Sequence, residues 1–198
     1  FMLTPFLLSL LCRSYALLLD ELPVPGNILI PMSVDLRGRA GIARDAVFFN
    51  QWSLQPLLIP RELCVNPEAV FAELKGQIFE NMSEQLPQAF RAASRLGRIA
   101  PFPFPMSLAN KTKRTGCGTF MYSFLSESSL KSGEFCGHRI LNLYHIPSMP
   151  PVTGAGVFMN SFGGALNVTL SYREDSLTPN AVRRFISSFV SALPKEAQ

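Results

Sequence analysis

The N-terminal segment alternates little between apolar and polar residues, and it predicts a helix buried on several sides. Thr4 followed by Pro5 is typical of a helix start, because the threonine oxygen can cap the first turn and proline has no N–H to leave unbonded there. Apolar residues then cover nearly the whole circumference to about Glu21, where two prolines and a glycine favour a stop. Arg13 interrupts the apolar run too early for a bilayer, so neither a transmembrane span nor a signal peptide is expected.

Residues 27–35 form an apolar run that predicts a central strand. Pro31 interrupts the run, and proline ordinarily marks an edge strand or a bulge because it has no N–H for the ladder. The strand then ends abruptly in Asp35, Arg37 and Arg39. A strand that leaves the core beside a cleft has this pattern, and so does a strand that simply reaches the surface.

The next segments predict a second strand and a long helix. Residues 46–60 alternate in part and are punctuated by prolines. Asn66 and Pro67 repeat the pattern of a capping residue followed by proline. The helix that follows has one apolar face, made of Val70, Phe71, Leu74, Ile78, Phe79 and Met82. Pro87 is expected to kink or break this helix.

The C-terminal half predicts strand after strand and then a closing helix. Strands are expected over residues 118–126, 138–146, 156–162 and 165–173. Gly163 and Gly164 predict a tight hairpin between the last two. Thr178 and Pro179 begin a helix whose core-facing stripe is Val182, Phe185, Ile186, Phe189, Val190 and Leu193. The whole pattern predicts a layered α/β (α+β) domain, in which helices flank a mixed sheet of about five strands.

Composition indicates one domain over residues 1–198 with an unusually large covered surface. Hydrophobic residues make up 47% of the chain and charged residues 16%, against a usual charged share of about 25%. The chain has 16 phenylalanines, and each ring needs something to bury it. Either the core is large or a partner covers part of the surface.

The distribution of positively charged residues does not indicate nucleic-acid binding. The 18 Lys and Arg residues exceed the 14 acidic residues, for a net charge of +4, and they are scattered apart from Lys111, Lys113 and Arg114. That short run is interpreted as a solvated loop in preference to an anion site. Because no basic stripe is interleaved with aromatic residues, nucleic-acid binding is not expected.

The cysteines indicate a reducing compartment. Cys12, Cys64, Cys117 and Cys136 show no paired spacing and are typical of reduced thiols in an intracellular protein, which predicts a cytoplasmic location. His138 and His145 could join Cys117 and Cys136 around a metal. Their spacing matches no standard zinc pattern, so no metal site is expected.

Standard catalytic motifs are absent from the sequence. It contains no glycine-rich phosphate loop, no G-x-S-x-G elbow, no H-E-x-x-H and no carboxylate pair at a useful spacing. His138 and His145 are the side chains whose ordinary pKa suits proton transfer near neutrality. They stand seven residues apart in one predicted strand, so they should point to opposite faces and form no joint site.

Polar residues inside apolar strands are the remaining candidates for a site. Asn50, Ser123, Asn160 and Ser161 interrupt otherwise apolar runs. Buried amides and hydroxyls need partners, and a cluster of them can line a polar pocket that orients a ligand. Alternatively, they bond to neighbouring backbone or mark a bulge.

The order of five segments carries a family resemblance. The segments are "TPFLLSLLCRSYALLL", "ILIPMSVDLRGR", "AVFFNQWSLQPLLIP", "GTFMYSFLSE" and "GAGVFMNSFGGALNVTLSYREDSLTPNAVRRFISSFVSAL". This order resembles the C-terminal half of the chloramphenicol-acetyltransferase-like superfamily. That superfamily includes peptide-synthetase condensation domains, alcohol acyltransferases, and wax ester synthase and diacylglycerol acyltransferase enzymes.

The resemblance implies one lobe of a two-lobed acyltransferase. In such enzymes the second His of an HHxxxDG motif takes the proton from the hydroxyl, amine or thiol that attacks an acyl thioester. The motif belongs to the N-terminal lobe and does not occur in this sequence. The resemblance therefore implies that this chain holds no catalytic residue and needs an N-terminal lobe, from the same protein or from a partner chain. The donor would be acyl-CoA or an acyl-carrier thioester, with no tightly bound cofactor.

Under the resemblance, this lobe would contribute tunnel wall and orientation. The expected tunnel residues are Arg37, Asn50, Ser123, Asn160 and Ser161. A hydroxyl or amide among them could stabilise the tetrahedral oxyanion. Arg37 could fix the strand end at the cleft or meet a phosphate of the pantetheine donor, or it could simply pair with Asp35.

A second hypothesis belongs to a different class of function. The chain could be a non-catalytic binding or scaffold protein of the same half-fold. Such a protein would use its exposed apolar face to form a homo-oligomer or to hold an apolar ligand.

Overall fold

The structure is a computed structural model that describes residues 2–18, 27–38, 51–99, 119–125, 133–147 and 153–194. Every structural statement below concerns these ranges. Predictions made for the following residues lie outside them: Arg39, Asn50, Lys111, Lys113, Arg114 and Cys117.

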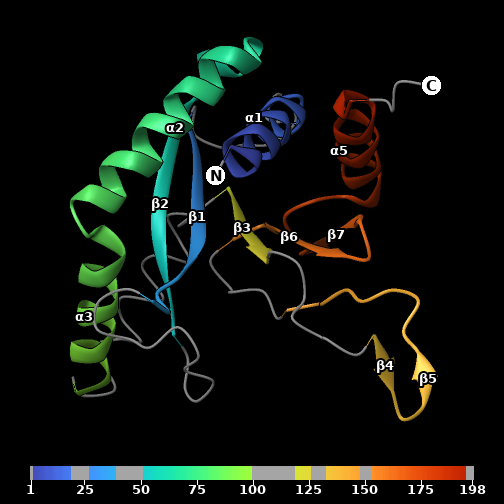
Figure 1. The fold of residues 1–198 in the computed structure, drawn as a ribbon. Coiled ribbons are helices and arrows are strands. Elements are labelled where there is room, and N and C mark those ends of the chain that lie inside the picture. Colours follow the sequence, from blue (N-terminus) through green and yellow to red (C-terminus); the bar gives the residue numbers. More distant parts are fainter. Residues whose placement is uncertain are drawn as a thin grey trace.

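A five-stranded mixed sheet forms the centre of the molecule (Figure 1). The strands are β1 (Asn27–Asp35), β2 (Trp52–Pro60), β3 (Phe120–Leu125), β6 (Ala155–Phe162) and β7 (Ala165–Tyr172). They are ordered β2-β1-β3-β6-β7. The three inner strands are parallel to one another, and each edge strand is antiparallel to its neighbour. The predicted α/β class and mixed sheet are therefore confirmed.

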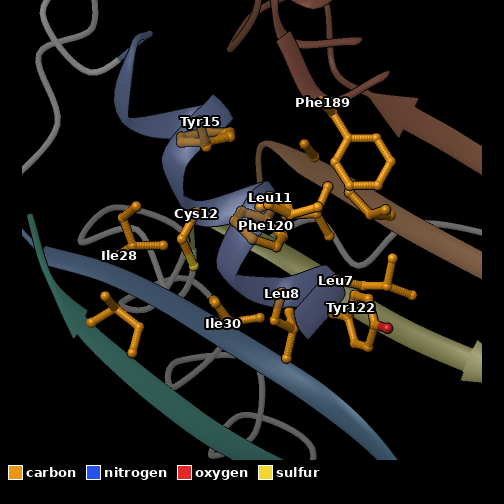
Figure 2. Close-up of a cluster of buried hydrophobic side chains, with 14 of the residues drawn as sticks. Leu7, Leu8, Leu11, Cys12, Tyr15, Ile28, Ile30, Phe120, Tyr122 and Phe189 are labelled. Atoms are coloured by element: carbon orange, nitrogen blue, oxygen red, sulfur yellow. The ribbon is translucent and has the colours of Figure 1, made fainter. Parts of the chain in front are cut away.

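The core lies between one face of this sheet and the helices. Helix α1 (Leu3–Ala16) is buried along most of its length, and Figure 2 shows Leu7, Leu8 and Leu11 among the side chains of β1 and β3. Phe189 of α5 (Pro179–Ala192) joins the same cluster. The prediction of a helix covered on several sides is confirmed.

The predicted limits of this first helix were wrong. Met2 occupies the N-cap position without a side-chain cap, and Thr4 lies inside the first turn. The helix ends at Ala16 instead of Glu21, because Leu18 already donates its N–H in a turn to the carbonyl of Tyr15. The apolar pattern continues past Ala16, and pattern alone could not reveal this turn.

Helices α2 (Pro67–Ser83) and α3 (Leu86–Ile99) follow a short 3-10 helix, η1 (Arg61–Val65). Asn66 caps α2 as predicted, accepting bonds from the N–H groups of Glu68 and Ala69. The expected break falls at Gln85, whose φ of 56° lies in the left-handed region, and Pro87 stands in the first turn of α3. Phe79 was assigned to the apolar face of α2 but is exposed.

The outer edge of β2 is closed by side chains of α2. Gln77 accepts a bond from the N–H of Leu58 at 2.9 Å and donates to the carbonyl of Leu58 at 2.7 Å. Asn81 donates to the carbonyl of Pro56 at 3.1 Å. Two amide side chains thus take the place of a further strand at this edge.

The prediction of a central strand over residues 27–35 is confirmed, and Pro31 lies inside it although proline ordinarily marks an edge strand or a bulge. The register of β1 with β2 runs without interruption from Asn27 to Asp35, and it places Pro31 opposite Pro56. Neither proline has an N–H, so they can occupy only a pair that exchanges no hydrogen bonds across this ladder. The position opposite Pro56 therefore leaves the bonds between β1 and β2 intact, and the missing N–H of Pro31 is on the side of β3.

The predicted strand over residues 138–146 was also wrong. A two-residue strand, β5 (His138–Arg139), pairs with β4 (Glu134–Phe135) in a separate small hairpin (Figure 1). Beyond it, Asn142 and Leu143 bond to side chains of the main sheet instead of forming a backbone ladder. Side-chain bonds can hold an extended segment without making it a strand.

The closing hairpin and helix follow the prediction closely. Gly163 and Gly164 join β6 to β7 with positive φ angles of 57° and 81°, as a two-residue turn requires. Thr178 caps α5 (Pro179–Ala192). Two members of the predicted core stripe, Ile186 and Val190, are exposed instead of buried.

Candidate functional site

The candidate site lies where the parallel inner strands end. β1 ends at Asp35 and β3 at Leu125, three residues beyond the pair Met32–Tyr122 that joins them. Leu125 is in turn aligned with Asn160 on β6. In open α/β sheets the carboxyl ends of the strands are the usual position for a ligand, so this edge is the first place to look for one.

Two of the predicted polar residues share one face of the sheet. Ser123 is aligned with Phe158, and Asn160 follows two residues later on the same side of β6. This face is opposite the helix-covered core, which takes Val157 and Met159 from the same strand. Ser161 therefore points to the helix side and does not join Ser123 and Asn160. Adjacent strand positions always separate in this way, which the sequence could have predicted.

Asn160 is only 5% exposed and has one satisfied and one unsatisfied polar atom. Its Nδ2 donates to the carbonyl of Leu143 at 2.6 Å. Its Oδ1 is buried and has no hydrogen-bond partner in the described part of the chain. A buried amide oxygen without a donor costs free energy, so this atom marks the position in the candidate site where a hydrogen-bond donor is missing.

Asn142 and Asn167 complete a polar cluster that the sequence analysis missed. Asn167 donates to the Leu143 carbonyl at 3.2 Å and to Oδ1 of Asn142 at 2.9 Å, and Asn142 donates back to Oδ1 of Asn167 at 2.8 Å. Asn167 stands opposite Asn160 in the hairpin. The two-residue turn fixes that pairing, so it could have been counted outward from Gly163 and Gly164.

Arg37 forms an ion pair with Asp35 at the end of β1. Its Nε lies 2.9 and 3.0 Å from the two carboxylate oxygens, its Nη2 lies 2.7 Å from Oδ2, and its backbone N–H also bonds to Oδ1. The hydrogen bond to Asp35 raises the pKa of the guanidinium. Both side chains are exposed, so the pair orders the strand end and leaves Arg37 accessible to solvent.

The two histidines do not meet. His138 is exposed in the small β4–β5 hairpin. His145 is half-buried, and its ring lies 6.0 Å from that of Phe158 at a near-perpendicular angle. His145 therefore lies on the same face of the sheet as Ser123 and Asn160, which makes it the histidine nearer to the candidate site.

The buried nucleophiles of the core are held in their neutral forms. Burial raises the pKa of Cys64 to about 11 and that of Tyr15 to about 12, and it raises the pKa values of Cys12 and Tyr122 as well. Cys12, Cys64 and Cys136 are free thiols. None of the buried groups has the lowered pKa that activates a nucleophile.

Metal-binding groups do not converge within the described ranges. No group of three or more His, Cys, Asp or Glu side chains there could hold an ion. Cys136 and His138 are both exposed in the small hairpin. The described part of the chain also contains no helix long and apolar enough to cross a membrane.

One open hollow of about 660 Å³ lies away from the candidate site. It is formed by the C-terminal end of α1, the start of β1 and η1, and Arg13, Arg61 and Cys64 lie in its lining. None of the predicted tunnel residues borders it. The start of β1 is the amino end of a parallel strand, whereas Ser123 and Asn160 lie toward the carboxyl ends.

Comparison with solved structures identifies the fold. The epimerization domain from the third module of tyrocidine synthetase B matches with a TM-score of 0.55 and 14% identity, over 92% of this chain and 40% of that chain. The chain has a chloramphenicol-acetyltransferase-like fold. TRI3 trichothecene 15-O-acetyltransferase from Fusarium sporotrichioides matches with a TM-score of 0.54 and 17% identity, over 92% of this chain and 40% of that one.

A condensation domain for chain release from the enacyloxin polyketide synthase matches this chain to a similar extent. Its TM-score is 0.56 at 11% identity, over 96% of this chain and 37% of that one. This chain thus spans about two-fifths of the proteins it resembles, as one lobe would. No protein-family model matches the sequence, and no curated protein matches it.

Proposed function

We propose that this chain is the C-terminal lobe of an acyltransferase that moves an acyl group from a thioester to a hydroxyl or amine. The observation that carries the proposal is the extent of the structural match: nearly the whole chain aligns, and it aligns to about 40% of each neighbour. The remaining part of such an enzyme would supply the histidine that takes the proton. This chain's sequence contains no HHxxxDG motif.

Exposed apolar residues near the candidate site support the need for a second lobe. Leu125 ends β3 with its side chain exposed. The segment that crosses the outer face of the sheet also exposes Leu141, Tyr144 and Ile146. Apolar side chains gathered in this way are typical of a surface that a partner covers. The N-terminal lobe would close over them and bury the candidate site.

In this proposal Ser123 and Asn160 orient the substrate. The Ser123 hydroxyl has no hydrogen-bond partner among the described residues and could donate to the oxyanion. Oδ1 of Asn160 can only accept, so it suits an N–H of an amide-containing arm such as pantetheine. Asn50 and Ser161 remain candidates of lower weight, because Asn50 lies outside the described residues and Ser161 points to the helix side.

The donor in the proposal is acyl-CoA or an acyl-carrier thioester, used as a substrate and not held as a cofactor. Arg37 is exposed beside the strand ends and already neutralised by Asp35. Its contribution to binding a donor phosphate would be modest for that reason. We extend the proposal to a cytoplasmic location, where free thiols persist. A wax-ester-synthase-like acceptor is one variant of the proposal among several.

Reconstitution tests the proposal directly. The 198-residue chain would be assayed with octanoyl-CoA, a primary alcohol or amine as acceptor and a thiol-reactive dye. It would be assayed first alone and then mixed with the N-terminal lobe that the proposal requires, from the same protein or a partner chain. We expect no acyl-dependent release of CoA from the chain alone and release from the mixture. Turnover by the chain alone that is lost in His145→Gln would refute the requirement for a second lobe.

A non-catalytic binding protein is the second candidate. The absence of the histidine motif from the sequence and the exposed apolar side chains favour it. In that case the mixture would release no CoA, although the two parts would still associate. Association measured alongside turnover therefore distinguishes the two functions.

A further inference from the structure

The two edge strands of the sheet differ in the partners of their outward-facing backbone groups. Side chains of α2 satisfy the outer edge of β2, as the bonds of Gln77 to Leu58 show. At the other edge, β7 has β6 on one side and no described strand on the other. An unpaired strand edge presents N–H and C=O groups ready to bond to another strand.

The register of the hairpin identifies the free backbone groups. Arg173 donates its N–H to the carbonyl of Gly154 at 3.0 Å, so its backbone faces β6. Backbone direction alternates along a strand, and the pairing of β6 with β7 has no bulge. The backbone groups that face away from β6 are therefore those of Leu166, Val168, Leu170 and Tyr172.

The sequence of β7 itself carries none of the usual devices that protect an edge strand. β7 reads "ALNVTLSY" over eight residues, with no proline and no charged residue. Charges, prolines and bulges are the means by which natural edge strands avoid pairing. Leu166 and Val168 are also 38% and 42% exposed, on the face of the sheet that the helices cover elsewhere.

The helix layer also leaves apolar side chains exposed at this end of the molecule. α5 buries Val182, Phe185 and Phe189, and Ser188 bonds to Ser14 of α1. Ile186 and Val190 lie on the flank turned away from α1, and they are 43% and 58% exposed. In Figure 1, α5 is the helix at the β7 end of the molecule. Both layers therefore stop at one end with apolar side chains uncovered.

We propose that the free edge of β7 and the outer flank of α5 form a self-association surface occupied by a second copy of this chain. A partner for this surface needs an uncharged edge strand together with an apolar helix beside it, and this chain supplies both. A two-fold axis perpendicular to the sheet keeps both helix layers on one side.

If this two-fold axis passes beside Thr169, all four outward-facing residues of β7 pair with residues of the partner's β7. Leu166 then meets the partner's Tyr172, and Val168 meets the partner's Leu170. Five strands from each copy form one continuous sheet of ten. The surface uses the free backbone edge and the helix-side face of β7, whereas Asn167 of the candidate site points to the opposite face. The proposal does not depend on the proposed function.

The mass of the 198-residue chain in solution tests this proposal. Sedimentation velocity over a range of about 1 to 100 µM should show a species of twice 21.9 kDa that grows with concentration. Val168→Pro removes an outward N–H that β6 does not use and should weaken the dimer about tenfold or more. Val168→Thr keeps the N–H and the side-chain shape, so it should leave the dimer nearly unchanged.

A second variant acts on the helix layer and does not alter the strand. Val190→Glu places a charge on the flank of α5 and should also weaken the dimer about tenfold or more. Phe79→Glu introduces the same charge at an exposed apolar position on α2, beside the opposite edge, and serves as the control. Loss of the dimer in Phe79→Glu, or its retention in both Val168→Pro and Val190→Glu, would overturn the assignment.

Amide hydrogen exchange gives a readout that needs no variant. In the monomer, the amides of Val168 and Leu170 should exchange quickly, and those of Asn167 and Thr169, which face β6, should exchange slowly. Raising the protein concentration should slow exchange at Val168 and Leu170 selectively. A chain that stays monomeric at every concentration, or that uses this edge only to bind the N-terminal lobe, contradicts the proposal.

Discussion

Asn160 on β6 and Asn167 on β7 stand opposite each other and donate to the same acceptor, the carbonyl of Leu143. Their Nδ2 atoms lie 2.6 and 3.2 Å from that oxygen. These two bonds to one oxygen hold the segment around Leu143 against the outer face of the sheet, although that segment forms no backbone ladder with it. The first of these bonds also fixes the orientation of the Asn160 amide, whose Oδ1 is buried without a hydrogen-bond partner among the described residues.

Asn160→Ala should lower the free energy of unfolding by about 1–2 kcal/mol, because it removes a buried bond to the Leu143 carbonyl. Urea denaturation followed by circular dichroism measures the change. Asn167→Ala is the matched control and should cost less, since Asn167 is only half-buried. Additive losses in the double variant would contradict a shared acceptor, for which coupled losses are expected.

Gln77→Leu should destabilise the fold by about 1 kcal/mol and expose the edge of β2, because both bonds to the Leu58 backbone are lost. Lys75→Leu alters an exposed position on the same helix and is the control. Light scattering during refolding should rise for Gln77→Leu and stay low for Lys75→Leu. Equal scattering from both variants would show that the amide does not protect the edge.

The free energy of unfolding should be constant from about pH 7 to 8.5 and then fall steadily to about pH 12. The folded-state pKa values of Cys64 and Tyr15 are raised to about 11 and 12 by burial, above the ordinary values of 9.0 and 10.0. A raised pKa means that the stabilisation is complete below the ordinary value and is lost as pH rises toward the folded-state value.

Denaturant midpoints measured at a series of alkaline pH values test that dependence. Tyr15→Phe should flatten the decline above about pH 10, because it removes one of the buried phenols. Tyr144→Phe removes an exposed phenol and should leave the profile unchanged. A midpoint that stays constant through pH 11 would contradict the burial of these groups.

Arg37→Ala should change the free energy of unfolding by less than about 1 kcal/mol, because its partner Asp35 is exposed and screened. In the reconstituted enzyme, the same variant should raise KM for a CoA thioester without changing kcat if Arg37 meets a donor phosphate. A truncated thioester without phosphate should show no difference between the two proteins. A fall in kcat with both donors would instead assign Arg37 to the positioning of the strand end.

Local signals in the sequence predicted much of the fold. The caps at Asn66 and Thr178 and the Gly163–Gly164 turn all lie where they were expected, because each depends on residues within a few positions of one another. The predicted site was less complete. Asn160 was identified, but Asn167 was not, and Ser161 was placed with the wrong group.

The sequence by itself determined the α/β class, the closing hairpin and the order of the main strands and helices apart from the strand expected over residues 138–146, since periodicity and turn chemistry act over short stretches of chain. Only the tertiary structure decided which polar groups meet and which apolar flanks remain uncovered. Asn160 finds its acceptor 17 residues away, and Ser14 of α1 lies beside Ser188 of α5. Such contacts depend on the register and packing of distant segments, which no local pattern encodes.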